Sequence, residues 1–222
     1  MVSATWQARE AAVIKEWLVN IDYSEGMQFL TEDEIDAEIQ AFFEEGNSLK
    51  MNEINISMLE ERLRSLEYVE RAEVYSTIES ELRVDVYQRK PLVRVHAEDE
   101  QYYLTERGLK FPLHPEFSAR VPLVSGKIDP EQWSDVLGLM QVIQEDSLLS
   151  AQIVEIERKE NGKYWLYPRL GNHTIRWGNL ENGKEKARKL KKFYKEIIRK
   201  TGADYYKSID LSFDDQVVAS KR

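Results

Sequence analysis

Residues 13–87 change from helical to alternating hydrophobic spacing, and this change restricts the possible fold more than any other feature. An apolar stretch over 13–21 predicts a first strand. Two helices should follow it, because Thr31 with Glu34, and then Ser57 with Glu60, have the spacing of a capping box. After each start, apolar residues recur every three or four positions, as one buried helix face requires. These residues are Ile35, Ile39, Phe42 and Phe43 in the first helix and Leu59, Leu63 and Leu66 in the second.

Two alternating stretches then predict a pair of strands over 72–77 and 82–87. In the second stretch, Leu82, Val84 and Val86 face one way and the residues between them face the other. The short link 78–81 has the length of a hairpin loop. The order strand, helix, helix, strand, strand predicts a small sheet with two helices on one face.

The balance of charge changes near Pro91, which we take as the joint between two modules. Residues 1–90 contain 20 acidic and 9 basic side chains, whereas the remainder contains 20 acidic and 22 basic ones. Beyond the joint, strands dominate, and two helices interrupt them over 131–144 and 184–199. The strands are predicted over 102–105, 109–111, 121–124, 153–158, 163–167, 174–177, 208–213 and 216–219. Asn161-Gly162 predicts a type I′ hairpin turn.

Residue types that carry chemistry are sparse. The chain has no cysteine, which excludes disulfides and thiolate catalysis. Its histidines, His96, His114 and His173, lie far apart in sequence, so we expect them at turns or on the surface and expect no metal and no cofactor. Because Gly-x-Ser-x-Gly and Gly-x-Gly patterns are also absent, we predict no catalytic residue and no enzyme activity. A hydrolase that uses His173 or His114 with a nearby carboxylate is the competing enzyme hypothesis.

The stretch Lys184 to Lys200 contains nine Lys or Arg side chains and two Glu. Its apolar residues have helical spacing, which favours a surface helix that lies on the sheet. Contact with an anionic lipid or an acidic partner is the alternative. The net charge of −9 argues against nucleic acid.

The last predicted strand has the properties of a binding edge. Gln216-Val217-Val218-Ala219 contains no proline and no charge, and the first charge after it is Lys221. Edge strands of open sheets have unpaired backbone groups to which an extended partner can add a strand. The pattern fits this role and fits equally a strand that only completes the sheet.

Several segments, in this order, resemble a known family. Leu59-Glu60-Glu61-Arg62-Leu63 and the segment 68–75 resemble the second helix and following strand of a POTRA domain, and 82–91 resembles its last strand and exit. The segments 102–108, 121–126, 168–175, 191–194 and 208–213 then follow the order of FtsQ (DivIB) cell-division proteins. The resemblance covers about residue 13 to the end and is similar to the Bacteroidetes branch.

The resemblance implies an α+β fold with a membrane-proximal segment 1–12, a POTRA domain over 13–91 and an FtsQ-type β domain over 92–222. The β domain is expected to be larger and mostly antiparallel with two helices. The family resemblance also implies a non-catalytic divisome scaffold, anchored in the inner membrane by a single helix, with this region in the periplasm. No apolar run here approaches the roughly 20 residues of a spanning helix, and an anchor upstream of Met1 is left open.

The resemblance further implies a partner, the FtsB–FtsL pair, with a strand of FtsB added to the last strand over 213–219. The partner-binding residues implied are Phe213, Asp215, Gln216, Val217, Val218 and Ala219. Phe213 matches an aromatic contact position, and Lys221 falls where some members have another aromatic residue. The POTRA domain is expected to help recruitment through other divisome proteins. The alternative is a POTRA-type polypeptide-binding module of an envelope transport or assembly system, where such modules usually occur in tandem.

Overall fold

The computed structural model describes residues 13–77, 81–213 and 215–222. The expected membrane-proximal segment 1–12 and most of the expected hairpin link 78–81 lie outside the described residues. The chain forms two compact units. Unit 1 contains the described residues up to Lys90 together with His114–Ser118, and unit 2 contains Pro91–Leu113 and the described residues from Ala119 to Arg222.

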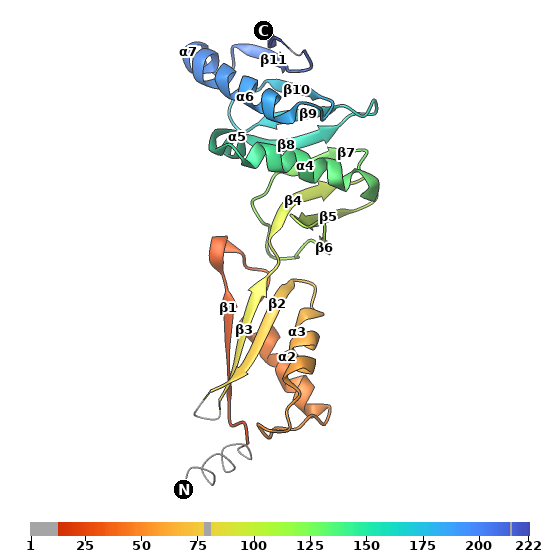
Figure 1. The fold of residues 1–222 in the computed structure, drawn as a ribbon, viewed down its shortest axis with the longest axis vertical. Coiled ribbons are helices and arrows are strands. Elements are labelled where there is room, and N and C mark those ends of the chain that lie inside the picture. Colours follow the sequence, from red (N-terminus) through yellow and green to blue (C-terminus); the bar gives the residue numbers. More distant parts are fainter. Residues whose placement is uncertain (1–12, 78–80, 214) are drawn as a thin grey trace. The chain divides into compact units, whose positions relative to one another are not determined.

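Unit 1 has the predicted order of strand, two helices and two strands (Figure 1). Its elements are β1 (Trp17–Asp22), the short 3-10 turn η1 (Ser24–Gly26), α2 (Glu32–Glu44), α3 (Ile56–Arg64), β2 (Val69–Ser76) and β3 (Leu82–Gln88). The three-stranded sheet has the order β1-β3-β2, with β1 parallel and β2 antiparallel to β3. The predicted inward positions Leu82, Val84 and Val86 are all buried.

The two helix starts differ in how well the sequence predicted them. Thr31 caps α2 with both bonds of the predicted capping box, to and from Glu34. The helix α3 is present as predicted, but its predicted capping box is wrong, because Asn55 is the N-cap and its Oδ1 accepts from the Met58 amide at 3.2 Å. Asn is among the strongest N-caps and precedes Ser57 in the chain. Glu60 instead accepts from the Val74 amide of β2 at 2.9 Å.

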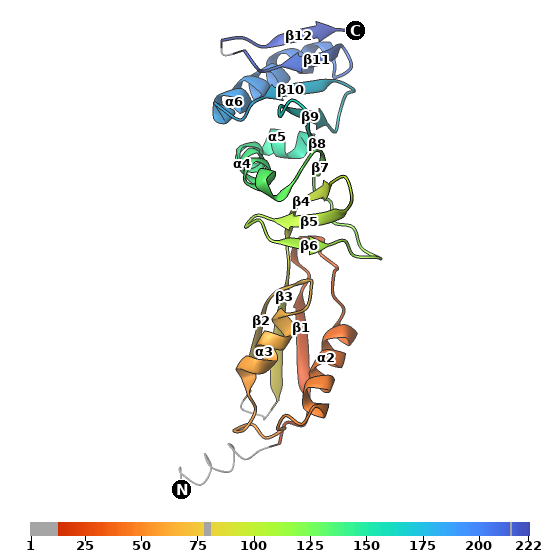
Figure 2. The same cartoon turned by 90° about the vertical axis from the view of Figure 1, so that its right-hand side faces the viewer.

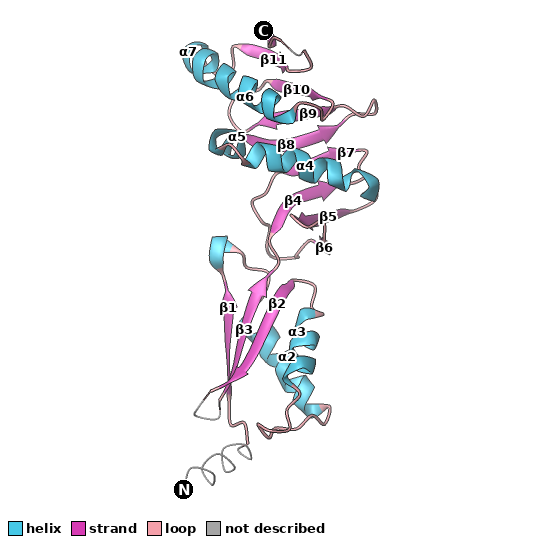
Figure 3. Cartoon of the chain, in the orientation of Figure 1, coloured by secondary structure: helices cyan, strands magenta, loops and turns pink. Residues whose placement is uncertain are grey.

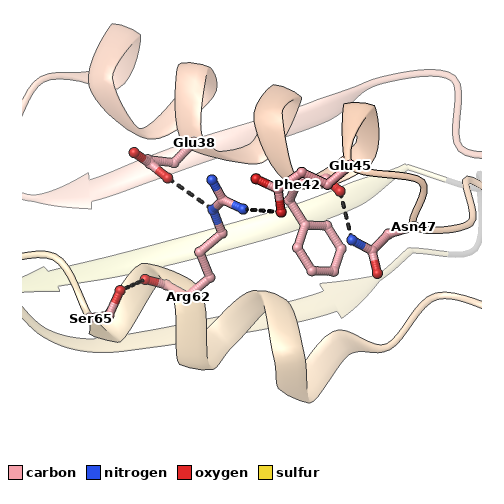
Figure 4. A network of polar contacts seen from close by, with 6 residues as sticks. All are labelled: Glu38, Phe42, Glu45, Asn47, Arg62 and Ser65. Carbon is pink, nitrogen blue, oxygen red and sulfur yellow. Dashed lines mark hydrogen bonds and ion pairs between the residues drawn. The ribbon is translucent and has the colours of Figure 1, made fainter.

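Arg62 joins the two helices of unit 1 (Figure 4). Its Nε donates to Glu38 Oε2 at 2.9 Å, and its Nη1 donates to Glu45 Oε2 at 2.8 Å. Beside it, Asn47 Nδ2 donates to the carbonyl of Phe42 at 2.7 Å, which satisfies an oxygen in the last turn of α2.

Unit 2 contains a nine-stranded sheet of order β12-β11-β10-β9-β8-β7-β4-β5-β6. The strands are β4 (Pro91–His96), β5 (Gln101–Thr105), β6 (Lys110–Pro112), β7 (Leu123–Gly126), β8 (Ile153–Arg158), β9 (Tyr164–Pro168), β10 (Thr174–Gly178), β11 (Tyr206–Asp210) and β12 (Val218–Lys221). Three neighbouring pairs, β4–β7, β7–β8 and β10–β11, are parallel, and the other five are antiparallel. The α+β fold class and the mostly antiparallel sheet are therefore confirmed.

The helices of unit 2 cover one face of this sheet and leave the opposite face open (Figures 2 and 3). They are α4 (Trp133–Gln144), preceded by the 3-10 turn η2 (Pro130–Gln132), then α5 (Ser147–Gln152) and α6 (Gly183–Phe193). A π-helical turn η3 (Tyr194–Ile198) and α7 (Arg199–Thr201) extend α6. The short helix α5 was not predicted, because its six residues are too few to show helical periodicity.

One strand was missed and the last strand was misplaced. The two units divide at Pro91, as predicted, but the strand β4 that begins at this residue was not predicted. The first position of a strand tolerates the amide hydrogen that proline lacks. The last strand was predicted over 216–219 and instead spans Val218–Lys221. The described residues between β11 and β12, 211–213 and 215–217, form no strand.

The hairpin at Asn161-Gly162 is confirmed, but its predicted turn type is wrong. Gly162 has a φ of +75°, whereas Asn161 does not have a positive φ. The Gly162 amide donates to the Lys159 carbonyl at 2.9 Å, and the Lys159 amide donates to Lys163 at 2.9 Å. This is a type I turn followed by a glycine bulge, which requires a left-handed backbone only at the glycine.

A single row of side chains under the helices crosses the sheet of unit 2. In the order of the sheet, from β5 through β4 and β7 to β12, the strand registers place one residue of each strand in line. All of these residues except the last are buried in one hydrophobic core. The row is Tyr102, Val95, Val124, Ile156, Leu166, Ile175, Ile209 and Ala219. It begins with a large aromatic ring and ends in a methyl group at the sheet edge.

Candidate functional site: the C-terminal edge of the sheet

The strand β12 is one edge of the nine-stranded sheet (Figure 2). It pairs antiparallel with β11, with Asp210 opposite Val218, Ile209 opposite Ala219 and Ser208 opposite Ser220. In the described part of the chain no strand pairs with the outer side of β12. The edge position that the sequence suggested for the last strand is therefore present, two residues further along the chain.

Two hydrogen bonds show which backbone groups of β12 point outward. The Arg222 amide donates inward to the Tyr205 carbonyl at 3.3 Å, and the Leu211 amide donates to Arg176 of β10 at 2.9 Å. Backbone groups along a strand alternate between its two neighbours. Because the Arg222 amide points to β11, the backbone groups of Ser220 and Val218 also point to β11. Because the Leu211 amide points to β10, the backbone groups of Asp210 and Ser208, which pair with Val218 and Ser220, point to β12.

The backbone groups of the remaining β12 residues, Ala219 and Lys221, are therefore directed away from the sheet. Each of these residues offers one N–H and one C=O to an added strand. Neither residue is a proline, and Lys221 has the single charged side chain in β12. The geometry of β12 therefore permits strand addition along its full length.

The six residues that the sequence singled out for partner binding are divided between β12 and the segment before it. Val218 and Ala219 lie in β12, whereas Phe213, Asp215, Gln216 and Val217 precede it. Asp215 and Gln216 are exposed, while Val217 packs against the core of unit 2. The proposed register over 213–219 is thus too early, since the strand itself begins at Val218.

Two exposed aromatic side chains lie near opposite ends of β12. Phe213 is 46% exposed, and its carbonyl accepts from Nζ of Lys189 on α6 at 2.7 Å, which fixes its backbone beside the helix. Tyr205, just before β11, is 43% exposed and stacks edge-on against Tyr206.

Sequence reasoning missed Tyr205, although the Tyr205-Tyr206 pair is visible as a doublet in the sequence. The ammonium of Lys221 lies 5.3 Å from the ring centroid of Tyr205. A hydrogen bond with the Tyr205 hydroxyl raises the pKa of Lys221. Tyr205 thus places an exposed aromatic ring beside Lys221.

The basic stretch forms α6 and its extension, and several of its lysines have internal partners. Lys184 pairs with Glu145 at 2.8 Å, and Lys191 pairs with Asp146. Lys186 is buried and donates to both oxygens of Asn179. The prediction of a helix that lies on the sheet is confirmed by its buried residues, Ala187, Leu190, Tyr194 and Ile198.

The histidines have structural contacts. His173 was expected at a turn or on the surface, but it is buried, because the turn before β10 is covered by the end of the α6 extension. Its Nδ1 lies 3.2 Å from the Ala203 carbonyl and its Nε2 2.8 Å from the Tyr194 hydroxyl. His114 Nδ1 accepts from the amides of Glu116 and Phe117. Among the described residues, no three His, Asp or Glu side chains gather as a metal site would require.

Comparison with known families agrees with this architecture. A POTRA-like module followed by a mixed sheet with an open C-terminal edge defines a two-domain scaffold class. Residues 90–220 match the family described as FtsQ/DivIB, C-terminal related, and residues 12–87 match a POTRA-like domain. The chain belongs to the FtsQ/DivIB family, as its resemblance had indicated. No curated protein matches the chain closely enough to be named as a relative.

The family match indicates a divisome-type scaffold with divisome protein partners, and families of both kinds are generally non-catalytic. Members of the FtsQ/DivIB family are membrane-anchored and have an extracytoplasmic part. Across the described residues, no helix combines the length and the apolar character that crossing a bilayer demands.

Proposed function

We propose that this chain is the periplasmic part of a single-pass inner-membrane divisome scaffold that binds the FtsB–FtsL pair. A strand of FtsB adds to β12. The observation that carries this proposal is the outer side of β12, which pairs with no strand of the described residues and where Ala219 and Lys221 direct their backbone groups away from the sheet. Unit 1 serves recruitment through other divisome proteins. The match of residues 90–220 to the division family favours this role over an envelope transport module.

Backbone pairing alone is too weak to hold the partner. The two outward residues can form up to four hydrogen bonds, each contributing about 0.5–1.5 kcal/mol net, or roughly 2–6 kcal/mol together. A dissociation constant near 1 μM requires about 8 kcal/mol after the cost of association is met. Side-chain anchors must supply the difference, and the exposed rings of Phe213 and Tyr205 have the position and the surface to do so.

The direction of the backbone groups provides a sharp test. Ala219→Pro removes an outward amide hydrogen and leaves the inward ladder to β11 intact, so it should abolish FtsB binding while the melting temperature changes little. Ser220→Pro removes an inward donor and should lower the melting temperature itself. Calorimetric titration of the purified chain with the FtsB–FtsL pair measures the first effect, and thermal unfolding measures the second.

The matched control is Ala219→Ser, which keeps the amide hydrogen and a small side chain and should bind as the unchanged chain does. If Ala219→Pro folds normally and binds FtsB–FtsL with unchanged affinity, strand addition at β12 is wrong.

A further inference from the structure

A groove of about 680 Å³ lies on the open face of the sheet, opposite the helices. Its floor consists of three short hydroxyl side chains from neighbouring strands, Thr174, Ser208 and Ser220. The registers place Ser208 between the other two, so the three lie in line across β10, β11 and β12. Because these side chains are short, they leave space above the sheet. Ser220 belongs to β12, so the groove extends to the edge strand.

Arg176 and Trp165 form one wall of this groove. The Arg176 guanidinium lies 5.3 Å from the centroid of the Trp165 ring. Its contact with the Asp210 carboxylate is long, at 3.8 Å, and its side chain is 49% exposed. A guanidinium held over an aromatic face keeps its donors in a fixed plane and retains its charge.

Two more cations, Lys207 and Arg222, form the opposite wall. Lys207 lies in a β-bulge of β11, where the register passes from Tyr206 to Ser208 against consecutive residues of β12. The bulge lets Lys207 and Ser208 both line the groove. Arg222 Nη2 donates to the Asn172 carbonyl at 2.6 Å, which holds the guanidinium beside the groove and leaves its other N–H groups for a ligand.

Three cations therefore surround a hydroxyl floor in a chain whose net charge is −9. The long contact with Asp210 offsets part of one charge, and the groove keeps an excess of positive charge. Carboxylates bind well to such a set of charged donors and hydroxyl groups. An acidic ligand is the chemistry that fits.

We propose that this groove binds an acidic side chain of the strand that adds to β12. The inference rests on the proposed function and deepens it by giving the added strand a charge pattern. Side chains of directly paired residues lie on the same face of a sheet, and neighbouring strands are about 4.8 Å apart. A partner residue that pairs with Ser220 therefore lies at the end of the groove. If this residue is a glutamate, its carboxylate can reach Arg222 and Lys207.

The opposite face sets the second half of the pattern. The partner residue beside Ala219 faces the helices and continues the apolar row that ends there. The added strand is therefore apolar beside Ala219 and acidic at the adjacent position beside Ser220. A strand with this alternation fits both faces of the edge.

The test combines charge reversal with the proline variant. In the whole chain, Lys207→Glu with Arg222→Glu should weaken binding of the FtsB–FtsL pair about ten-fold or more and flatten its dependence on salt. Lys192→Glu with Lys195→Glu makes the same change of charge on the helix side, where both side chains are exposed. That control should bind as the unchanged chain does. Replacing an acidic residue of the FtsB strand with lysine should restore binding to the reversed chain.

The outcomes separate the two proposals. If Ala219→Pro abolishes binding while the Lys207→Glu, Arg222→Glu chain keeps its affinity and salt dependence, the groove inference is overturned and strand addition stands. An equal loss in the helix-side control would also overturn it, because the effect would then be one of overall charge. Loss of binding to purified peptidoglycan, with FtsB binding unchanged, would assign the groove to an anionic glycan instead.

Discussion

The side chain of Gln88 in unit 1 forms four hydrogen bonds to the backbone between Asp22 and Leu30. Its Oε1 accepts from the amides of Phe29 and Leu30 at 2.7 and 3.1 Å, and its Nε2 donates to the carbonyls of Asp22 and Met27. The side chain is buried at the end of β3, and the bonds hold the segment that leads from β1 to α2. The side-chain amide of Gln88 thus satisfies backbone groups between β1 and α2 that have no partner strand.

Gln88→Ala should lower the free energy of unfolding by about 2–4 kcal/mol, because buried amides lose their acceptor. Gln40→Ala removes an exposed bond to Glu44 and should change it by less than about 0.5 kcal/mol. Denaturant unfolding of both variants measures the difference. Equal effects would show that the connecting segment is held by other contacts.

The buried His173 predicts a dependence of stability on pH. A carbonyl only accepts hydrogen bonds, so Nδ1–H donates to Ala203 and Nε2 accepts from the Tyr194 hydroxyl, which defines a neutral ring. Burial lowers the pKa of His173 below its usual 6.5. The unfolded chain therefore binds a proton near pH 6.5 that the folded chain does not bind until lower pH.

The contribution of His173 is accordingly complete above about pH 6.5 and is lost as the pH falls toward the folded pKa. In that window the free energy of unfolding should fall by up to about 1.4 kcal/mol per pH unit. Urea unfolding from pH 6.5 to 5.0 measures the slope, and His173→Gln should reduce it. A slope that His173→Gln leaves unchanged would assign the effect to other groups.

At the scale of elements, two polar residues at the start of α3, Asn55 and Ser57, differ in their role, because only Asn55 caps the helix. Asn55→Ala removes the bond to the Met58 amide and should lower the free energy of unfolding by about 1 kcal/mol. Ser57 lies inside the helix, so Ser57→Ala should be neutral or slightly stabilising because alanine is the better helix former. Thermal unfolding ranks the two variants, and the reverse order would restore Ser57 as the cap.

The element scale also shows what periodicity and end signals can predict. The strand β8 was predicted with its observed ends, since an apolar run and a glycine turn both limit it. The start of β12 was not, because Gln216 and Val217 have the local character of a strand. Only the pairing with β11 decides that Val218 is the first residue in the ladder.

At the scale of the whole molecule, the changes in hydrophobic period and charge predicted two modules, and the family resemblance implied the α+β class. Each unit has its own hydrophobic core, as two separate sets of apolar residues require. The edge position of the last strand was open from the pattern alone and follows from the sheet order. The cationic groove could not be predicted, because Trp165, Arg176, Lys207 and Arg222 meet only when four strands align.

The row of core side chains that runs from Tyr102 to Ala219 has a thermodynamic consequence. An incoming apolar side chain beside Ala219 becomes the next layer of an existing interior, so water leaves both surfaces when the strand docks. Binding should therefore have a negative change in heat capacity and grow more exothermic with rising temperature. Titration calorimetry between 10 and 30 °C, at roughly 10 °C intervals, measures that slope. Ala219→Asp, which keeps the outward amide, should make it less negative.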